Sequence, residues 1–222
     1  IMERRHGNTN LQFLLTTIRR QAASCIFGLA PMLDAILNRH LSELELSEAG
    51  DDDTPESIGD ELLEFRNDIQ DLVRRSRSLS EVDPKLEALR RVIQDKQKLS
   101  NNKLLLFSTF RHTLSYLVAH LGNEGVRTGL IHGDVPEDER RTLRNRFSQP
   151  KESPEAIDLL VSSEVGCEGL DYQFCDGLVN YDLPWNPMRV EQRIGRIDRY
   201  GQKSETVAIY NFVTPGTVDA DI

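Results

Sequence analysis

The sequence has no apolar run long enough to cross a membrane as a helix. Such a helix needs about 18 or more mostly apolar residues in a row, and no stretch of that kind occurs among the 222 residues. The first ten residues, IMERRHGNTN, also lack the apolar middle region of a secretion signal. We therefore expect an intracellular protein, cytoplasmic if it is bacterial, with no membrane partner.

Cysteine is scarce, with only Cys25, Cys167 and Cys175. A small, odd number does not fit the disulfide framework of a secreted protein, and none of the three stands in a CxxC pattern or at metal-ligand spacing from a histidine. We interpret them as reduced cysteines rather than as ligands or nucleophiles. The sequence predicts no metal site on this chain.

Positive charge is in the minority, since 27 Lys and Arg face 36 Asp and Glu and the formal net charge is −9. This balance argues against a nucleic-acid partner, because phosphates attract Lys and Arg. Residues 43–64, however, contain ten acidic and no basic residues, so the rest of the chain sums to about +1. We interpret this acidic insert as a solvated loop, and the alternative is an acidic lure for a basic partner.

Two motifs of ATP-binding proteins are missing. The phosphate loop G-x-x-x-x-G-K-[ST] does not occur, and no Asp-Glu pair follows an apolar strand in the manner of a magnesium-binding motif. None of the 14 glycines therefore belongs to a phosphate cradle. If this chain works with ATP, another domain must hold most of the nucleotide.

What is present divides into two parts, of which the first is helical. Apolar residues recur at helical spacing in residues 11–41, where Pro31 marks either a break or the start of a new helix, and again in residues 60–78. We expect two helices in the first of these stretches. We therefore expect an all-helical segment over residues 1–80, interrupted by the acidic insert at 43–64.

From about residue 83 the pattern changes to short apolar runs that alternate with amphipathic helices. Near-continuous apolar strands are typical of a parallel sheet that helices cover on both faces. The sequence therefore predicts an α/β domain over residues 81–222. The expected strands are 103–107, 127–131, 157–161, 177–181 and 206–213, and the expected helices are 84–98, 110–122, 136–147 and 188–199.

Small or polar residues follow each of the first four expected strands. In a parallel sheet these positions share one edge, where ligands bind in α/β proteins. We therefore expect them to form a single polar rim. The rim residues are Ser108, Thr109, His132, Gly133, Ser162, Ser163 and Asp182.

The stretch EQRIGRIDRYGQ, residues 191–202, holds three arginines and two glutamines. On a helix, Gln192, Arg196 and Arg199 share one side, and the opposite side is apolar and would dock on the sheet. Gly195 lies between the two arginines, and glycine within a helix costs roughly 1 kcal/mol relative to alanine unless close approach requires it. This favours a polyanion that approaches closely, and the alternative is a solvated helix face. The apolar side consists of Val190, Ile194 and Ile197.

Four stretches resemble, in order and at matching spacing, motifs of superfamily-two helicases and translocases. LLLFSTFRHTLSYL at 104–117 resembles the fourth motif, SSEVGCEGLDY at 162–172 the fifth and QRIGRIDR at 192–199 the sixth, while IHGDVPEDERRTLRNRF at 131–147 resembles the segment between the fourth and fifth. The continuation YDLPWNP…EQRIGRIDRYGQ resembles the Swi/Snf family of double-stranded DNA translocases, and is nearest to its bacterial RapA-like branch. The resemblance implies the second of two RecA-like lobes, so we expect a fragment with the interlobe helices and the second lobe of a longer enzyme.

In that family ATP binds between the two lobes, so the resemblance implies that ATP and Mg2+ are bound mainly by the missing first lobe. Arg196 and Arg199 match the arginine fingers of the sixth motif, which stabilise charge during phosphoryl transfer. Glu168 departs from the family pattern, in which Arg or Gly is usual at this position. The other positions that match the nucleotide cleft are Gln192, Gly169 and Asp171, whose carboxylate suits a ribose hydroxyl.

The resemblance also implies that the rim faces a nucleic-acid strand. Hydroxyl and backbone N–H groups at such positions contact phosphates and fix register without reading bases. For the serines the alternative is capping of the next helix, for His132 a turn, and for Trp185 a role in the core. The implied contacts are Ser108, Thr109, Arg111, His132, Gly133, Arg140, Ser162, Ser163 and Trp185.

We therefore expect the C-terminal motor lobe of an ATP-dependent translocase of double-stranded DNA, whose partner is the first RecA-like lobe and which is inactive without it. Two alternatives stay open. One is the second lobe of an RNA helicase, which the WNP and RYGQ neighbourhoods disfavour. The other is a non-enzymatic α/β module that binds nucleic acid or protein, and the intact Arg196 and Arg199 argue against it.

Overall fold

The computed structural model describes residues 9–37, 66–79 and 82–217, with side chains from residue 15 onward in the first helix and from residue 67 onward in the third. The N-terminal part holds α1 (Thr9–Ser24), the 3-10 turn η2 (Ile26–Gly28), α2 (Leu29–Leu37) and α4 (Arg66–Arg77). The rest of the described chain holds α5 (Pro84–Gln97), β1 (Leu104–Phe107), α6 (Arg111–Asn123), β2 (Thr128–Ile131), α7 (Glu137–Ser148), β3 (Leu159–Ser162), the 3-10 turn η4 (Val165–Cys167), β4 (Gly177–Asn180), α8 (Pro187–Ile194) and β5 (Ala208–Asn211).

The N-terminal helices have a small core of their own. α2 buries Leu33 against Ile69 of α4, which confirms a helical N-terminal part, whereas the acidic insert at 43–64 lies outside the described residues. The first two helices are separated at Cys25, where the backbone is extended, and α2 begins at Leu29. Of the two interpretations of Pro31, the start of a new helix is confirmed and a break at Pro31 is wrong. Pro31 lies in the first turn of α2, which tolerates proline because N–H groups there have no partner within the helix.

The five strands form one all-parallel sheet in the order β2-β3-β1-β4-β5. β1 is buried along its whole length, and Leu105 pairs with Leu160 of β3 on one side and Leu178 of β4 on the other. Leucine and valine suit these strands because the sheet is covered on both faces. The predicted parallel α/β sheet is confirmed, and the observed strands differ from the expected ranges by no more than two residues at either end.

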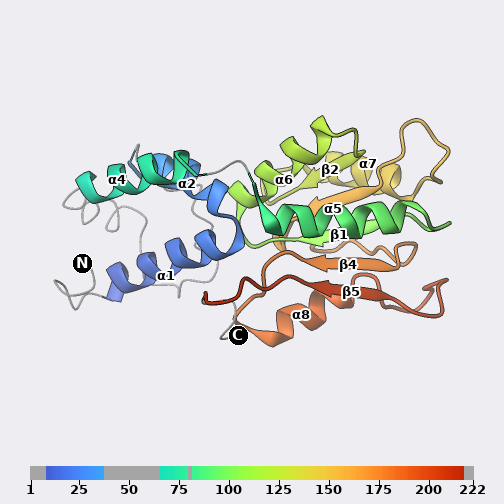
Figure 1. The fold of residues 1–222 in the computed structure, drawn as a ribbon. Helices are drawn as coiled ribbons and strands as arrows, with labels where there is room; N and C mark the ends of the chain where they lie inside the picture. Colours follow the sequence, from blue (N-terminus) through green and yellow to red (C-terminus); the bar gives the residue numbers. More distant parts are fainter. Residues whose placement is uncertain (1–8, 38–65, 80–81, 218–222) are drawn as a thin grey trace.

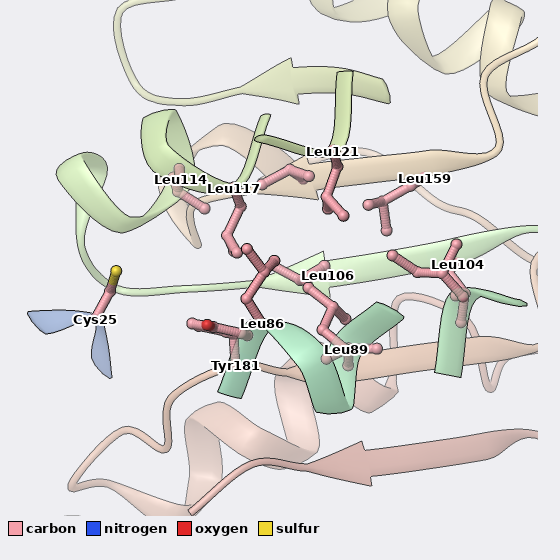
Figure 2. Close-up of a cluster of buried hydrophobic side chains, with 13 residues drawn as sticks. Cys25, Leu86, Leu89, Leu104, Leu106, Leu114, Leu117, Leu121, Leu159 and Tyr181 are labelled. Atoms are coloured by element: carbon pink, nitrogen blue, oxygen red, sulfur yellow. The ribbon is translucent and has the colours of Figure 1, made fainter. Parts of the chain in front are cut away.

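Helices lie on both faces of the sheet (Figure 1), and successive strand residues alternate between two apolar clusters. Figure 2 shows the first cluster, in which Leu86 of α5 and Leu117 of α6 pack with Leu106 of β1. In the second cluster, Leu105 of β1 packs with Phe147 of α7. Removing most of such a fully buried side chain costs about 2–5 kcal/mol, so these two clusters fix the position of the sheet edges.

α8 is shorter than the sequence predicts. It spans Pro187–Ile194 and ends because Gly195 is its C-cap, after which the Arg196 N–H bonds three residues back, to the Arg193 carbonyl, at 3.1 Å. The prediction of one helix over 188–199 is therefore wrong beyond Ile194. Gly195 is the C-cap of α8, and the nearest atom of the chain that a Cβ would meet there lies 3.4 Å away, so no close contact within the described chain requires glycine. Close approach of a polyanion to Gly195 stays a prediction.

The carboxyl ends of the strands point toward the N-terminal helices (Figure 1). The end of α1 contacts the sheet domain directly, because Ser24 Oγ donates to Asp182 Oδ2 at 2.6 Å and Gln21 Nε2 donates to Thr113 Oγ1 at 3.0 Å. These four side chains are fully buried. Within the described ranges, no helix combines the length and the apolar character that crossing a membrane demands.

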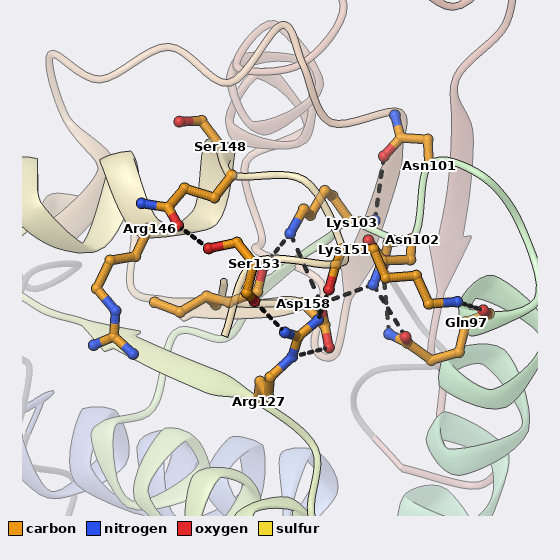
Figure 3. A network of polar contacts seen from close by, with 12 residues as sticks. Gln97, Asn101, Asn102, Lys103, Arg127, Arg146, Ser148, Lys151, Ser153 and Asp158 are labelled. Carbon is orange, nitrogen blue, oxygen red and sulfur yellow. Dashed lines mark hydrogen bonds and ion pairs between the residues drawn. The ribbon is translucent and has the colours of Figure 1, made fainter. Parts of the chain in front are cut away.

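The opposite edge carries a set of charges that we call the amino-edge network: the buried Lys103 and Asp158 and the half-buried Arg127, with the buried Asn102 (Figure 3). Asp158 accepts from Arg127 at 2.7 and 2.8 Å and from Asn102 at 2.7 Å. Lys103 Nζ lies 3.7 Å from Asp158 and donates to the Ile157 carbonyl at 2.6 Å. Burial lowers the pKa of Lys103, and Asp158 opposes that shift. All three charges of this network therefore have partners within the chain.

Candidate functional site

The expected rim residues lie together at the carboxyl edge, because the strands that precede them are parallel neighbours. The backbone ladder continues past the strands, with Ser108 N–H donating to the Ser162 carbonyl at 3.2 Å and Ser163 N–H to the Ile131 carbonyl at 3.0 Å. Asp182, after β4, accepts from the Thr109 N–H at 2.8 Å. The prediction that these residues share one polar edge is confirmed.

The hydroxyls of the rim turn inward. Ser108 donates to Asp182, Ser162 donates to the Ser163 carbonyl at 2.8 Å, and Ser163 Oγ accepts from the N–H three residues on at 3.2 Å. The three serines are at most 1% exposed and Thr109 is 7% exposed. These contacts are those of capping and turn residues, the alternative weighed above. Contact between these hydroxyls and a nucleic acid stays a prediction and requires the rim to move.

Two arginines hold the turn that follows β2. Arg140 donates to the Gly133 carbonyl at 2.5 Å and to a neighbouring carbonyl at 2.7 Å, and Arg111 pairs with Asp134 at 2.6 Å. His132 is half-buried, and burial together with Arg111 lowers its pKa, so its imidazole is neutral at neutral pH. Both arginines thus stabilise the turn, and phosphate contacts from them, from His132 and from Gly133 stay predictions.

A hollow of about 270 Å³ opens beside the carboxyl edge. Gln192 and Arg196 both line it, although only Gln192 lies on α8. Arg196 is half-buried, and its guanidinium makes no hydrogen bond or ion pair with any residue that the structure describes. A cation held in this way can bind an anion without first losing a partner. The rest of the lining consists of Phe107, Thr109, Glu164, Val165, Glu168, Arg189 and Arg193.

Sequence reasoning missed Arg193, which is the most deeply placed cation of the site and only 2% exposed. It donates to Glu164 at 2.6 and 3.0 Å, to Asn180 Oδ1 at 3.0 Å and to the Asp182 carbonyl at 2.9 Å. A signal existed, because on a helix Arg193 falls beside Ile197 on the apolar side, where an arginine must find buried partners. Of the expected apolar side, Ile197 is buried and Val190 and Ile194 are half-buried.

Arg199 and Asp171 form an ion pair with each other. The Arg199 side chain is 53% exposed and that of Asp171 33%. Gly169, two residues before Asp171, has φ +75°, a conformation that favours glycine. Arg199 and Asp171, which the resemblance assigns to phosphate and to ribose, are therefore bound to each other in this structure. Their contact with a nucleotide stays a prediction, and opening such an exposed pair costs at most about 1 kcal/mol.

Trp185, which follows β4, is 51% exposed. The guanidinium of Arg20, from α1, lies 5.9 Å from its ring centroid and 5.7 Å from that of Phe110. Part of the ring is thus covered by α1 and the rest is open to solvent. Contact of Trp185 with nucleic acid stays a prediction.

Among the described residues, no three His, Cys, Asp or Glu side chains group closely enough to hold a metal ion. Two carboxylates of the site, Glu164 and Asp171, are paired with arginines. Cys25, Cys167 and Cys175 are buried free thiols, and burial raises the pKa of Cys25 and Cys175 to about 12 and also raises that of Cys167. Such thiols are unreactive because the thiolate is the nucleophile.

The parallel sheet with helices on both faces and a polar carboxyl edge defines a RecA-like α/β lobe. The family model of the helicase conserved C-terminal domain matches residues 84–201, which is more than half of the chain. The chain belongs to this family.

Relatives by sequence fit the resemblance to Swi/Snf-like enzymes. The chain is 38% identical over 130 residues to the uncharacterized ATP-dependent helicase YqhH of Bacillus subtilis, covering 59% of this chain and 22% of that protein. It is 37% identical over 110 residues to the RNA polymerase-associated protein RapA of Vibrio campbellii, covering 50% of this chain and 11% of that protein. The chain thus spans less than a quarter of the length of these curated relatives.

Two solved structures share the fold. The C-terminal part of the Fun30 ATPase domain superposes with a TM-score of 0.59 at 19% identity, covering 98% of this chain and 72% of that one. The Hef helicase domain of Pyrococcus furiosus superposes with a TM-score of 0.58 at 21% identity, covering 99% of this chain and 45% of that one. At these identities the likeness concerns the fold alone.

Proposed function

We propose that this chain is the C-terminal motor lobe of a longer ATP-dependent translocase of double-stranded DNA. Residues 81–222 are the lobe, and residues 1–80 are the helical segment that joins it to a first RecA-like lobe. Membership of the helicase C-terminal domain family and similarity to an ATP-dependent helicase and to RapA support this proposal. The lack of a phosphate loop supports the further point that the chain alone does not hydrolyse ATP.

The observation that carries the proposal is the state of Arg196. It lines the hollow beside Gln192, and its guanidinium has no hydrogen-bond or ion-pair partner in the described part of the chain. Desolvating a charged group without a partner is unfavourable, so a half-buried arginine of this kind is best explained by an anion that arrives from outside. The phosphates of ATP, presented by the first lobe, are that anion.

Arg196 acts mainly by charge. A guanidinium offers two N–H groups in one plane to two phosphate oxygens, and a finger of this kind contributes a rate factor of about 10³ to 10⁵ to phosphoryl transfer. Mg2+, when bound with ATP on the first lobe, neutralises further charge on the phosphates. Gln192, on the same wall of the hollow, orients groups at the reacting phosphate through its amide.

Arg199 and Asp171 act after their mutual ion pair opens. Asp171 then accepts from a ribose hydroxyl, and Arg199 turns to the phosphates. This exchange is cheap because both side chains are partly exposed and such a pair contributes at most about 1 kcal/mol.

DNA binds across the carboxyl edge through its backbone. Gly133 and Trp185 are exposed there, and His132 is half-buried and neutral. Backbone contacts of this kind position a duplex without reading its sequence. Arg111 and Arg140 add positive charge, although each already holds part of the turn after β2.

The test is single-turnover ATP hydrolysis by the full-length protein at saturating ATP and double-stranded DNA. Arg196→Ala is expected to lower the rate at least about 100-fold with little change in ATP affinity, since a finger acts on the transition state. Arg196→Lys should not restore it, because an ammonium lacks the planar fork. Arg91→Ala, which removes an exposed arginine on α5, is the matched control and should leave the rate unchanged.

Near-wild-type turnover in Arg196→Ala, with an unchanged thermal melt, would remove the proposed catalytic role. The nucleic acid is tested in the same assay. Stimulation by double-stranded DNA supports the proposal, whereas stimulation by RNA alone would favour the second lobe of an RNA helicase.

A further inference from the structure

A line of buried hydrogen bonds leads from the end of α1 to the carboxyl edge of the sheet. Gln21 Nε2 donates to Thr113 Oγ1 at 3.0 Å, and the hydroxyls of Thr113 and Ser24 lie 3.1 Å apart. Ser24 gives its only hydroxyl proton to Asp182 Oδ2 at 2.6 Å, so the proton between the two hydroxyls comes from Thr113. All four side chains are fully buried, so bulk water does not replace a lost donor.

Asp182 joins this line to the rim. Its two oxygens also accept from Ser108 Oγ and from the Thr109 N–H, and Arg193 Nη2 lies 4.0 Å away. Burial by itself raises the pKa of Asp182, but Arg193 and the donors Ser108, Ser24 and Thr109 outweigh burial, and the pKa lies below its ordinary value of 3.8. The carboxylate is therefore ionised, and these donors surround it.

Arg193 continues the line into the hollow. It donates to the Asp182 carbonyl at 2.9 Å and to Glu164 Oε1 at 2.6 Å, while Glu164 Oε2 accepts from Arg189 at 2.8 Å. Glu164, Arg189 and Arg193 all line the hollow that holds Arg196. One connected set of contacts therefore reaches from α1 to the wall of the proposed phosphate site.

Stability alone is a weak explanation for this set. A buried ion pair is often no more stabilising than apolar residues of the same volume, because desolvation offsets the attraction between the charges. What the set does provide is a fixed geometry, since buried side chains that are joined by several hydrogen bonds hold one another in place. The member farthest from the hollow lies on α1, in the helical N-terminal part.

From this geometry we infer that Ser24 and Asp182 are positioning residues. Through them, the docking of α1 sets the placement of Arg193 and Arg189, the arginines that line the hollow at the end of this set of contacts. The helical N-terminal part is thus a regulator of the phosphate site, and undocking of α1 lowers turnover without loss of ATP binding. This inference rests on the proposed function of the hollow. It adds that turnover depends on the docking of α1, which the proposed role of the arginines does not by itself imply.

The experiment compares two losses of contact to the same helix end in the full-length protein. Ser24→Ala removes the donor to Asp182, and Thr214→Val removes the hydroxyl that donates to the neighbouring Ala23 carbonyl at 2.8 Å without touching the line. Ser24→Ala is expected to lower kcat about tenfold and to leave KM for ATP within about twofold, since positioning acts on the transition state. Thr214→Val should leave both near wild type.

Rates are measured at a temperature below the melting midpoint of every variant. Equal kcat in Ser24→Ala and Thr214→Val, or a rise in KM without a fall in kcat, overturns the inference. If Ser24→Ala does not fold, Thr113→Val decides instead, because it breaks the line one bond farther from Asp182 and should give a smaller loss of kcat of the same kind.

Arg196→Ala in the same series separates this inference from the proposed function. If Arg196→Ala keeps wild-type turnover, the proposed function of the hollow fails. If Arg196→Ala loses turnover and Ser24→Ala behaves as Thr214→Val does, only the role of α1 fails.

Discussion

The sheet carries a buried carboxylate at each of its two edges, Asp158 at the amino edge and Asp182 at the carboxyl edge. Both are less than 10% exposed, and both have an arginine as partner. At the amino edge every charged group bonds to another group of the same network or to the backbone beside it. Lys103 donates to a carbonyl, and Arg127 donates to Asp158 with two nitrogens. At the carboxyl edge they continue from Asp182 to residues that line an open hollow.

The difference shows that buried charge by itself does not indicate function. In the amino-edge network the charges of Lys103, Arg127 and Asp158 all have partners, so nothing is left to bind. In the hollow, Arg189 and Arg193 pair with Glu164. Arg196 lines the same hollow but its guanidinium lacks a hydrogen-bond or ion-pair partner among the described residues. A site is therefore better recognised by the group that a satisfied network leaves over than by the network itself.

The largest effect is expected at the amino edge, from Asp158→Ala. Removing one partner of a buried ion pair leaves an uncompensated charge and costs about 3–5 kcal/mol, which for a domain of this size lowers Tm by about 10 °C. Because this edge is far from the hollow, kcat per folded molecule in the full-length protein should not change. Thermal melts and single-turnover rates check the two parts, and a lower kcat at a temperature where the protein is folded would contradict the comparison.

A double variant sharpens this prediction. Asp158→Val with Lys103→Met replaces the buried pair by apolar side chains of roughly similar volume, and Arg127, which is 33% exposed, can reach solvent. The double variant should recover much of the stability that Asp158→Ala loses, since such replacements are often neutral or stabilising. If the double variant is no more stable than Asp158→Ala, the charges of this network stabilise the fold in a way that apolar side chains cannot replace.

An intermediate effect is expected from Asp182→Asn, and it should depend on pH. The pKa of Asp182 is lower in the folded chain than its ordinary value of 3.8, so its charge stabilises the fold above about pH 4 and this contribution is lost as the pH falls further. At pH 7 the free energy of unfolding of wild type should exceed that of Asp182→Asn by about 2 kcal/mol, the usual loss for hydrogen bonds to a charged group. Denaturant titrations from pH 7 to 3 check this, and a difference that stays constant to pH 3 would contradict it.

The sequence predicted the sheet well because burial is periodic along the chain. Apolar runs such as LLLF at 104–107 can only be satisfied inside a sheet that is covered on both faces. The end of α8 was predicted wrongly, because side-chain periodicity does not show where the backbone changes from four-residue to three-residue hydrogen bonds. That change occurs at Gly195, and glycine within the apolar pattern was the only local sign of it.

The site could be predicted only in part. Its polar edge followed from strand order, because residues just past parallel neighbours must meet. The contacts of Arg193 could not be predicted, since they join residues from three separate segments: Thr109, Glu164, and Asn180 with Asp182. The pairing of Arg199 with Asp171 was also missed, because motifs assign both residues to a ligand and not to each other.

The smallest effect is expected from Glu168→Gln, at the mouth of the hollow. Glu168 is exposed and lines the same hollow as Arg196, so its charge opposes an incoming phosphate. Removing that charge should lower KM for ATP in the full-length protein by about two- to fivefold, the range for exposed charge pairs worth up to about 1 kcal/mol. The effect should shrink between low salt and physiological salt, where the Debye length falls to about 8 Å.

Glu155→Gln is the control, because Glu155 is an exposed acid after α7 that does not line the hollow. It changes the net charge of the chain by the same amount, so a fall in KM that appears in both variants would be a general charge effect. A fall confined to Glu168→Gln would mean that the nucleotide phosphates come close to Arg196. The carboxyl edge would then bind an anion, as the amino edge does not. An unchanged or raised KM in Glu168→Gln would place the phosphates elsewhere and leave Arg196 without its proposed anion.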